Sequence, residues 1–220
     1  MKPFVTPSGC ATFWPLLRKP STHERSWCWL GDVLRRLHLC KVPAGAISLS
    51  DPCGVIRLRL ETYSRLKQHD RGIYNALIEM SDEAEMLFHS VSAAAPQCLI
   101  HGDVHMENVL MDGSRAYLSD YETSGIGPRL WDLAQPVALN WHRGLPNHSL
   151  EEFFEAYGYD PQGTKEFADL MFVRDLLDTS YIAEIVNRHP EAESELAFRL
   201  RSGIGDPARL ARWRFLRPRR

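Results

Sequence analysis

The spacing of hydrophobic residues in the first half of the chain predicts three helices. Apolar side chains recur three and four positions apart, which is the period of one helix face, in a short segment that ends near His38 and contains Leu30, Val33, Leu34 and Leu37. A loop is expected over about 43–52, followed by a second helix over about 55–67. A longer helix is predicted from Gly72 to just before Pro96.

The pattern changes to a strand-like period in the middle of the chain. Residues 98–100 form a short apolar run that is typical of a strand. Two further apolar runs, at 109–111 and 116–118, flank the turn-rich residues 112–115, and this arrangement predicts a β-hairpin. Polar residues at the ends of these runs are therefore expected in loops that short strands hold in place.

The helical period returns after Gly127 and Pro128. Helices are predicted over about 130–141 and 164–187, and residues 149–152 have the pattern of a capping box that opens another helix. We expect the remainder to be broken up by Pro190, Gly203, Gly205 and Pro207. Taken together, the elements predict an α+β chain that is mainly helical, with a small β-hairpin in its middle.

Composition narrows the classes of partner. The 220 residues carry 26 basic and 28 acidic side chains, so there is no bulk charge that would favour nucleic acid or a membrane. Prolines at positions 3, 7 and 15 interrupt any apolar run long enough for a signal or membrane segment. The five cysteines contain no C-x-x-C pair and are expected to be buried or free thiols. We therefore expect a cytoplasmic protein without nucleic-acid or membrane partners.

Three polar residues near the predicted hairpin have the spacing of a phosphoryl-transfer site. Asp103 follows the strand at 98–100, Asn108 lies five residues later, and Asp120 follows the second hairpin run. Phosphoryl transfer needs mainly positioning and charge neutralisation, because its transition state is loose. Asp103 would orient or deprotonate the attacking hydroxyl, while Asn108 and Asp120 would ligate Mg²⁺, which prefers oxygen ligands. Turn and capping chemistry is the alternative reading of these three residues, since Asp and Asn favour loops.

The same segment resembles a known family, the aminoglycoside phosphotransferase and choline kinase group of the protein-kinase-like fold. The resemblance runs from Thr12 to about Asn187 and rests on His101-Gly102-Asp103 with Asn108, on Asp120-Tyr121-Glu122, on Gly127-Pro128 and on Trp131-Asp132-Leu133-Ala134. It implies a kinase-like C-terminal lobe that uses ATP and Mg²⁺, with Asp103 as the catalytic residue and Asn108 and Asp120 as the metal ligands. It further implies that Asp132 supports the catalytic loop.

The N-terminal part departs from the family pattern. The resemblance makes residues 12–14 the strand that enters the adenine-binding hinge, with Phe13 and Trp14 against the nucleotide. Such enzymes also have a glycine-rich loop and a strand lysine before the hinge, and neither can be assigned here. We thus expect residues 1–14 to be a remnant of the N-terminal lobe and hinge, 15–205 to form the C-terminal lobe, and 206–220 to be an Arg-rich tail, loose and solvated.

Several other residues carry narrower expectations. His101 is expected to be structural, bonding to loop backbone, whereas His105 could line the site and Glu122 could be either an accessory ligand or a solvated side chain. Trp131 is expected in the core, as are Phe153, Phe154 and Tyr157. Acidic residues of the later helices could attract a cationic substrate but are more simply solvated helix faces, namely Glu151, Glu152, Glu155 and Asp160.

The function that these observations favour is an ATP- and Mg²⁺-dependent transfer of the γ-phosphoryl group to a hydroxyl of a small polar molecule. An alternative is a catalytically silent kinase-like lobe that binds a ligand or partner, because the phosphate loop and lysine are unassigned. A metallophosphoesterase is a third option, since residues 102–105 imitate one of its metal motifs, but a matching Gly-Asp block further along is missing. Neither the acceptor nor the oligomeric state can be derived from the sequence.

Overall fold

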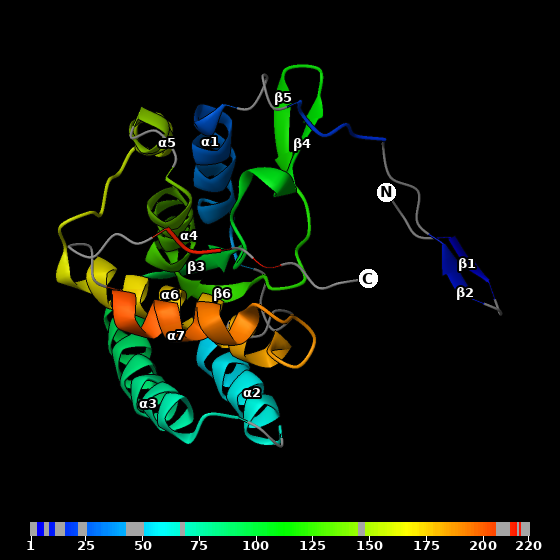
Figure 1. Ribbon diagram of the computed structural model, residues 1–220. Helices are drawn as coiled ribbons and strands as arrows, with labels where there is room; N and C mark the ends of the chain where they lie inside the picture. Colours follow the sequence, from blue (N-terminus) through cyan, green and yellow to red (C-terminus); the bar gives the residue numbers. More distant parts are fainter. Residues whose placement is uncertain are drawn as a thin grey trace.

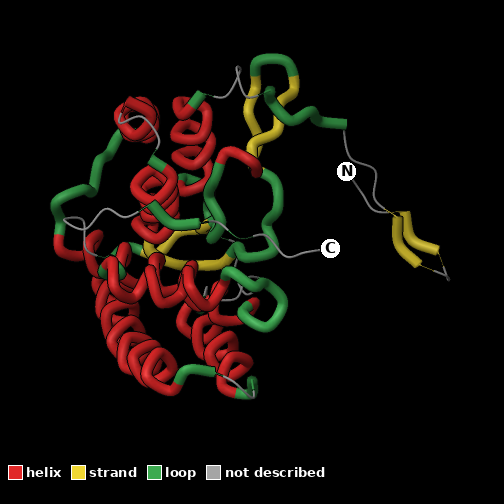
Figure 2. Tube along the Cα trace, viewed as in Figure 1, coloured by secondary structure: helices red, strands yellow, loops and turns green. Residues whose placement is uncertain are grey.

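The chain folds into a helical body that carries three small antiparallel strand pairs (Figures 1 and 2). The computed structural model describes the backbone of residues 4–6 and 9–11, and residues 16–21, 26–42, 51–66, 69–144, 148–205, 212–214 and 216. The helices are α1 (Trp27–His38), α2 (Pro52–Ser64), α3 (Arg71–Ala94), α4 (Arg129–Arg143), α5 (His148–Tyr157), α6 (Lys165–Ile185) and α7 (Ala192–Ser202). The strands are β1 (Phe4–Thr6), β2 (Gly9–Ala11), β3 (Gln97–Ile100), β4 (Val109–Asp112), β5 (Arg115–Leu118) and β6 (Gly125–Pro128), and Met106–Asn108 form the 3-10 turn η1.

Local sequence signals explain where several helices begin and end. Asp51 and Asp70 cap α2 and α3 by accepting hydrogen bonds from backbone N–H groups of the first turn. Pro52 occupies the first turn of α2, where its missing N–H costs nothing. Gly144 ends α4 in the left-handed conformation, at φ 64°, which glycine adopts without strain.

Helix α6 lies at the centre of the body. It packs against α2, α3, α4 and α7, so that its buried residues are distributed around much of its circumference. Figure 1 shows α2, α3, α6 and α7 in one half of the molecule and α1, α4 and α5 in the other, with β3 and β6 between them. A helix covered on several sides needs no single apolar stripe.

Two of the three strand pairs flank the loops that carry the polar motif. β3 pairs with β6, and β4 pairs with β5 as the predicted hairpin. Arg18 adds a bridge on the outer edge of β4, because its N–H and C=O exchange hydrogen bonds with Met111 at 3.2 and 2.8 Å. The segment that precedes α1 is therefore tied to the same hairpin.

The observed elements confirm most of the predicted ones and correct a few. The predicted fold class, mainly helical with a small β component, is confirmed. The capping box was misplaced, because α5 already begins at His148 and Ser149 lies inside its first turn. The strands β1, β2 and β6 were not predicted, and the break expected after Pro190 is wrong because α7 occupies Ala192–Ser202.

The tail was expected to be loose and solvated, and this is wrong at Trp213. Trp213 is only 5% exposed and stacks on the ring of His142, with centroids 3.5 Å apart and planes 8° from parallel. The Trp213 ring also contacts Arg199, whose guanidinium carbon lies 4.4 Å from the ring centroid. Among the described residues of the tail Trp213 alone is buried, and the polar residues around it gave no sign of this in the sequence.

The core expectations hold. Trp131 is 1% exposed, and Phe153, Phe154 and Tyr157 are all buried. The four cysteines whose side chains the structure describes, Cys28, Cys40, Cys53 and Cys98, form no disulfide. Among the described helices, none is long and apolar enough to cross a bilayer.

Candidate active site

The backbone of the loop after β3 is fixed by one buried carboxylate. Asp132, in the first turn of α4, is completely buried and accepts hydrogen bonds from the backbone N–H groups of His101 and Gly102, each at 2.7 Å. Charge-assisted bonds of this kind are about twice as strong as neutral ones. The arrangement matches the supporting role that the resemblance implies for Asp132.

Asp132 is itself linked to two other helices. The Nε2 atom of His38, at the end of α1, lies 3.0 Å from Asp132 Oδ2, and His38 Nδ1 lies 2.8 Å from the hydroxyl oxygen of Tyr157 in α5. Burial raises the pKa of Tyr157 to about 12, so its hydroxyl stays protonated at neutral pH. The anchor of the loop is thus part of a buried hydrogen-bonded chain.

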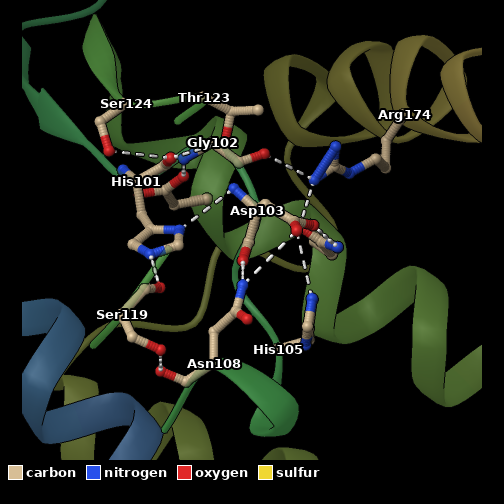
Figure 3. Close-up of polar contacts among 11 residues, drawn as sticks. His101, Gly102, Asp103, His105, Asn108, Ser119, Thr123, Ser124 and Arg174 are labelled. Atoms are coloured by element: carbon tan, nitrogen blue, oxygen red, sulfur yellow. Dashed lines mark hydrogen bonds and ion pairs between the residues drawn. The ribbon is translucent and has the colours of Figure 1, made fainter. Parts of the chain in front are cut away.

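His101 is buried and both its ring nitrogens contact backbone. Its Nδ1 accepts a hydrogen bond from the N–H of Asp103 at 3.3 Å, and its Nε2 lies 2.9 Å from the carbonyl oxygen of Ser119 (Figure 3). An acceptor at Nδ1 and a donor at Nε2 describe the neutral Nε2–H tautomer. His101 therefore ties the Asp103 loop to the end of β5, in the structural role that we expected.

Gly102 is required by the close approach of a neighbouring loop. It has φ 85°, and a Cβ at this position would collide with the backbone oxygen of Thr123. The hydroxyls of Thr123 and Ser124 donate to the carbonyl oxygen of His101, at 3.0 and 3.3 Å. The loop after β5 and the loop after β3 are consequently held face to face.

Asp103 presents its carboxylate at the surface of this loop. Its side chain is 39% exposed, and it accepts hydrogen bonds from Gln135 Nε2 at Oδ1 (2.7 Å) and from His105 Nε2 at Oδ2 (3.2 Å). Burial raises the pKa of the Asp103 carboxyl, but the bonds from His105 and Gln135 and the charge of Arg174 lower it by more, so that the pKa lies below its usual range. The group is ionised at neutral pH and able to accept a proton.

Asn108 lies beside Asp103 with its amide turned in a defined direction. It is 6% exposed, and its Nδ2 donates to the backbone oxygen of Asp103 at 3.0 Å and approaches the Asp103 carboxylate at 3.5 Å (Figure 3). This leaves Oδ1 of Asn108 as an oxygen that accepts no hydrogen bond from the described residues. The N–H and hydroxyl of Ser119 both donate to the Asn108 carbonyl oxygen, at 2.9 and 3.0 Å.

Asp120 comes directly after this contact and has an unusual backbone. Its φ of 67° makes it the one non-glycine residue with positive φ in the described part of the chain. A non-glycine residue in the left-handed region is uncommon, and such strain concentrates at functional sites. Asp120 is exposed, and its carboxylate has no protein partner among the described residues.

The remaining predicted residues fall into three groups. Phe13 and Trp14 lie outside the described residues. Glu122 is exposed, as are Glu151, Glu155 and Asp160, whereas Glu152 is half-buried. His105 does line the site through its contact with Asp103.

Two contributors to the site were not foreseen, Gln135 and Arg174. Gln135 lies three positions after Asp132, within the apolar stripe of the predicted helix. Its polar side chain in that stripe is the only sequence signal for a role in the site. Arg174 is 3% exposed in α6, where it follows the apolar run Leu170–Val173, and a charge at the end of such a run is a sequence signal for a buried partner. Which partner it has could not be read without the fold, because 72 positions separate Arg174 from Gly102.

The donor set fits a hard divalent cation better than a transition metal. The described residues contain no cluster of three or more His, Cys, Asp and Glu side chains with the geometry of a metal site. The amide oxygen of Asn108 and the carboxylate of Asp120 are two oxygens that such an ion could use. Mg²⁺ is commonly held by one or two protein groups, with phosphate oxygens and water completing the octahedron.

This fold and site define a protein-kinase-like phosphotransferase lobe. Residues 15–167 match the model of the Phosphotransferase enzyme family, and the chain belongs to that family. A search of curated proteins gave no match.

Solved structures show the same fold at low sequence identity. A choline/ethanolamine kinase family protein from Mesorhizobium loti aligns with TM-score 0.63 and 21% identity, covering 90% of this chain and 70% of the other. Choline kinase LicA from Streptococcus pneumoniae aligns with TM-score 0.61 and 16% identity over 92% and 75% of the two chains. The amicoumacin kinase hAmiN, in complex with AMP-PNP, Ca²⁺ and Ami, aligns with TM-score 0.67 and 13% identity over 94% and 66%.

Proposed function

We propose that this chain transfers the γ-phosphoryl group of ATP to a hydroxyl of a small polar molecule, in the presence of Mg²⁺. The observation that carries the proposal is the ionised, half-exposed carboxylate of Asp103, held beside the amide of Asn108 in a chain of the Phosphotransferase enzyme family. The proposal is supported by three solved structures of similar fold whose names describe small-molecule kinases or a kinase family protein.

Asp103 would receive the acceptor hydroxyl and take its proton. The hydroxyl oxygen forms a bond to the γ-phosphorus, the bond from the γ-phosphorus to the β–γ bridging oxygen breaks, and ADP leaves. A positioned carboxylate contributes mainly by orienting the nucleophile in line, because the transition state is loose. The lowered pKa of Asp103 keeps the carboxylate ionised and makes it a weak base, which agrees with a role that is mainly the orientation of the hydroxyl.

Asn108 and Asp120 are the residues that would hold Mg²⁺. The ion supplies neutralisation of the phosphate charge that develops during transfer. The amide oxygen of Asn108 accepts no hydrogen bond from the described residues, and the carboxylate of Asp120 is exposed on a backbone of positive φ. Phe13 and Trp14 are proposed to contact the adenine, and the proposed lobe boundaries remain 1–14, 15–205 and 206–220. We place the protein in the cytoplasm, where ATP is available and thiols stay reduced.

Replacement of Asp103 tests this function. The Asp103→Asn variant keeps the shape of the side chain but removes the proton acceptor, and it should lower ATP-dependent phosphorylation by roughly 10²- to 10⁴-fold. The measurement is ADP release with a panel of hydroxylated acceptors, including amino alcohols and aminoglycosides. The matched control is Asp112→Asn in the exposed hairpin turn.

Two results would count against the proposal. Near wild-type turnover of Asp103→Asn contradicts the role of Asp103. Failure of the purified wild-type chain to bind ATP with Mg²⁺ in a calorimetric titration favours the silent, ligand-binding lobe instead.

A further inference from the structure

Gln135 holds the side chain of Asp103 from the same helix that holds its backbone. Gln135 lies three residues after Asp132 in α4, so the two side chains project from one helix face. Asp132 accepts hydrogen bonds from the backbone N–H groups of His101 and Gly102, and Gln135 Nε2 donates to Asp103 Oδ1 at 2.7 Å. One turn of α4 therefore controls both the path of the loop and the direction of its carboxylate.

The orientation of the Gln135 amide is decided by Arg174. A guanidinium can only donate, so the Gln135 oxygen must face Arg174, to which it is hydrogen-bonded. A carboxylate without its proton can only accept, so the amide nitrogen must face Asp103. If the Gln135 amide were flipped, its nitrogen would face the donor Arg174 and its oxygen would face the acceptor Asp103, so both hydrogen bonds would be lost. Gln135 thus relays a hydrogen bond in one direction, from Arg174 to Asp103.

Arg174 is in turn fixed on three sides. Its Nη2 donates to the carbonyl oxygen of Gly102 at 3.1 Å, and its guanidinium carbon lies 4.6 Å from the centroid of the Trp131 ring. Figure 3 shows the side chain reaching from its helix towards Gly102, beside the Asp103 carboxylate. With 3% exposure, Arg174 is shielded from water and makes no direct ion pair with Asp103.

We propose that Gln135 and Arg174 are positioning residues that fix the rotation of the Asp103 carboxylate. With Oδ1 bound to Gln135, Oδ2 lies on the side of His105 and of Asn108, which is one of the two proposed metal ligands. This inference rests on the proposed phosphoryl transfer. A loss of about 1 Å in the placement of a reacting group can cost on the order of 10²-fold in rate.

Two substitutions separate positioning from folding. Gln135→Glu keeps an acceptor for Arg174, so the fold retains that partner, but it replaces the donor to Asp103 with a second carboxylate that repels it. Arg174→Lys keeps the charge but loses the planar guanidinium that lies over the Trp131 ring and places Nη2 between Gln135 and Gly102, so the donor is no longer held at that position. We expect each variant to lower kcat by about 10- to 100-fold with KM for ATP and acceptor changed by less than about threefold.

The matched control for the arginine is Arg199→Lys. Arg199 is likewise buried, at 1% exposed, and stacks on a tryptophan, Trp213, but it pairs with Glu195 and does not reach the catalytic loop. Arg199→Lys should lower the melting temperature and leave kcat within about twofold of wild type. For glutamine, the exposed Gln162→Glu serves as the control.

A kcat within twofold of wild type in both Gln135→Glu and Arg174→Lys, or a loss confined to KM, overturns the inference. If the wild-type chain transfers no phosphoryl group, the proposed function fails, yet positioning is still tested by crystal structures of wild type and Gln135→Leu. A rotated Asp103 carboxylate in the variant supports the relay, and an unmoved carboxylate overturns it.

Discussion

At the scale of single residues, three carboxylates near the site differ in how deeply they are buried, and their roles differ accordingly. Asp132 is fully buried, and both of its oxygens accept hydrogen bonds from backbone N–H groups, while one of them also contacts His38. Asp103 is half-exposed and keeps access to solvent, while Asp120 is exposed in a strained backbone. The same side-chain chemistry therefore serves as an anchor, as a proposed base and as a proposed ligand.

The sequence predicted those candidate residues that follow a local spacing. Asp103, Asn108 and Asp120 lie on one short stretch, so a motif of fixed spacing reaches them. Gln135, Arg174 and His38 come from α4, α6 and α1, and their contacts exist only because these helices pack together. Long-range partners of this kind cannot be derived from periodicity in a single chain.

The cysteine thiols offer a test that depends on pH. Burial raises the pKa of Cys53 to about 12 and of Cys98 to about 11, so that both are protonated at neutral pH. In the native protein at pH 8, iodoacetamide should modify the exposed Cys28 and Cys40 first. Labelling of Cys98 should become faster by about tenfold per pH unit up to about pH 11, because only the thiolate reacts.

Peptide mapping by mass spectrometry gives the labelling rate at each cysteine. Unfolding in urea at pH 8 is the control, in which all four described thiols should react at similar rates. Native labelling of Cys98 as fast as that of Cys40 would contradict the burial assigned to Cys98.

At the scale of elements, the apolar period predicted most of the helices, including α4 and α6 with their buried polar residues, but it missed α7. The predicted helix ahead of Pro96 corresponds closely to α3, which has an apolar stripe and an Asp cap. Helix α7 was missed because its buried face includes the Glu195 and Arg199 pair, which interrupts the apolar period. Pro190 and Gly203 flank α7 and do not break it. Strand β6 was missed because its Gly125–Pro128 sequence resembles a turn, yet Gly127 is needed where Ile100 packs across the pair.

The contact between α1 and α5 provides a prediction at this scale. A Cβ on Gly31 would collide with the backbone oxygen of Phe153, and backbone cannot move as easily as a side chain. Gly31→Ala should therefore lower the free energy of unfolding by about 1–3 kcal/mol, despite the better helix propensity of alanine.

Urea unfolding followed by circular dichroism measures this change. Gly72→Ala in α3 is the matched control, since its Cβ would approach only the Asp70 side chain, at 3.2 Å. That control should be neutral or slightly stabilising. Equal stability of Gly31→Ala and wild type would show that the helices can separate without cost.

At the scale of the whole molecule, the residues near the C-terminus close the packing of three helices. Trp213 lies between His142 of α4 and Arg199 of α7, and His142 Nε2 lies 3.0 Å from Asp175 Oδ1 in α6. The indole N–H of Trp213 donates to Ser202 at 3.3 Å. The residue thus contacts elements that are far apart in the sequence.

Removal of this side chain should weaken the whole lobe. Trp213→Ala is expected to lower the free energy of unfolding by about 3 kcal/mol, since it deletes a buried aromatic ring and leaves a cavity. Trp213→Phe keeps an aromatic ring against His142 and should lose less. Denaturant titration of both variants provides the comparison, and a change below about 0.5 kcal/mol in Trp213→Ala would show that the docking contributes nothing to stability.

The pairing of Arg18 with Met111 has a mechanical consequence. The two backbone hydrogen bonds attach the segment at 16–21 to the edge of the hairpin at Met111. Met111 lies two residues after Val109 and three after Asn108. A tensile load on the chain at Arg18 therefore acts on Met111 through these two bonds. Met111 lies in β4, which begins one residue after the proposed metal ligand Asn108, so that tension on this segment bears on the strand next to the candidate site.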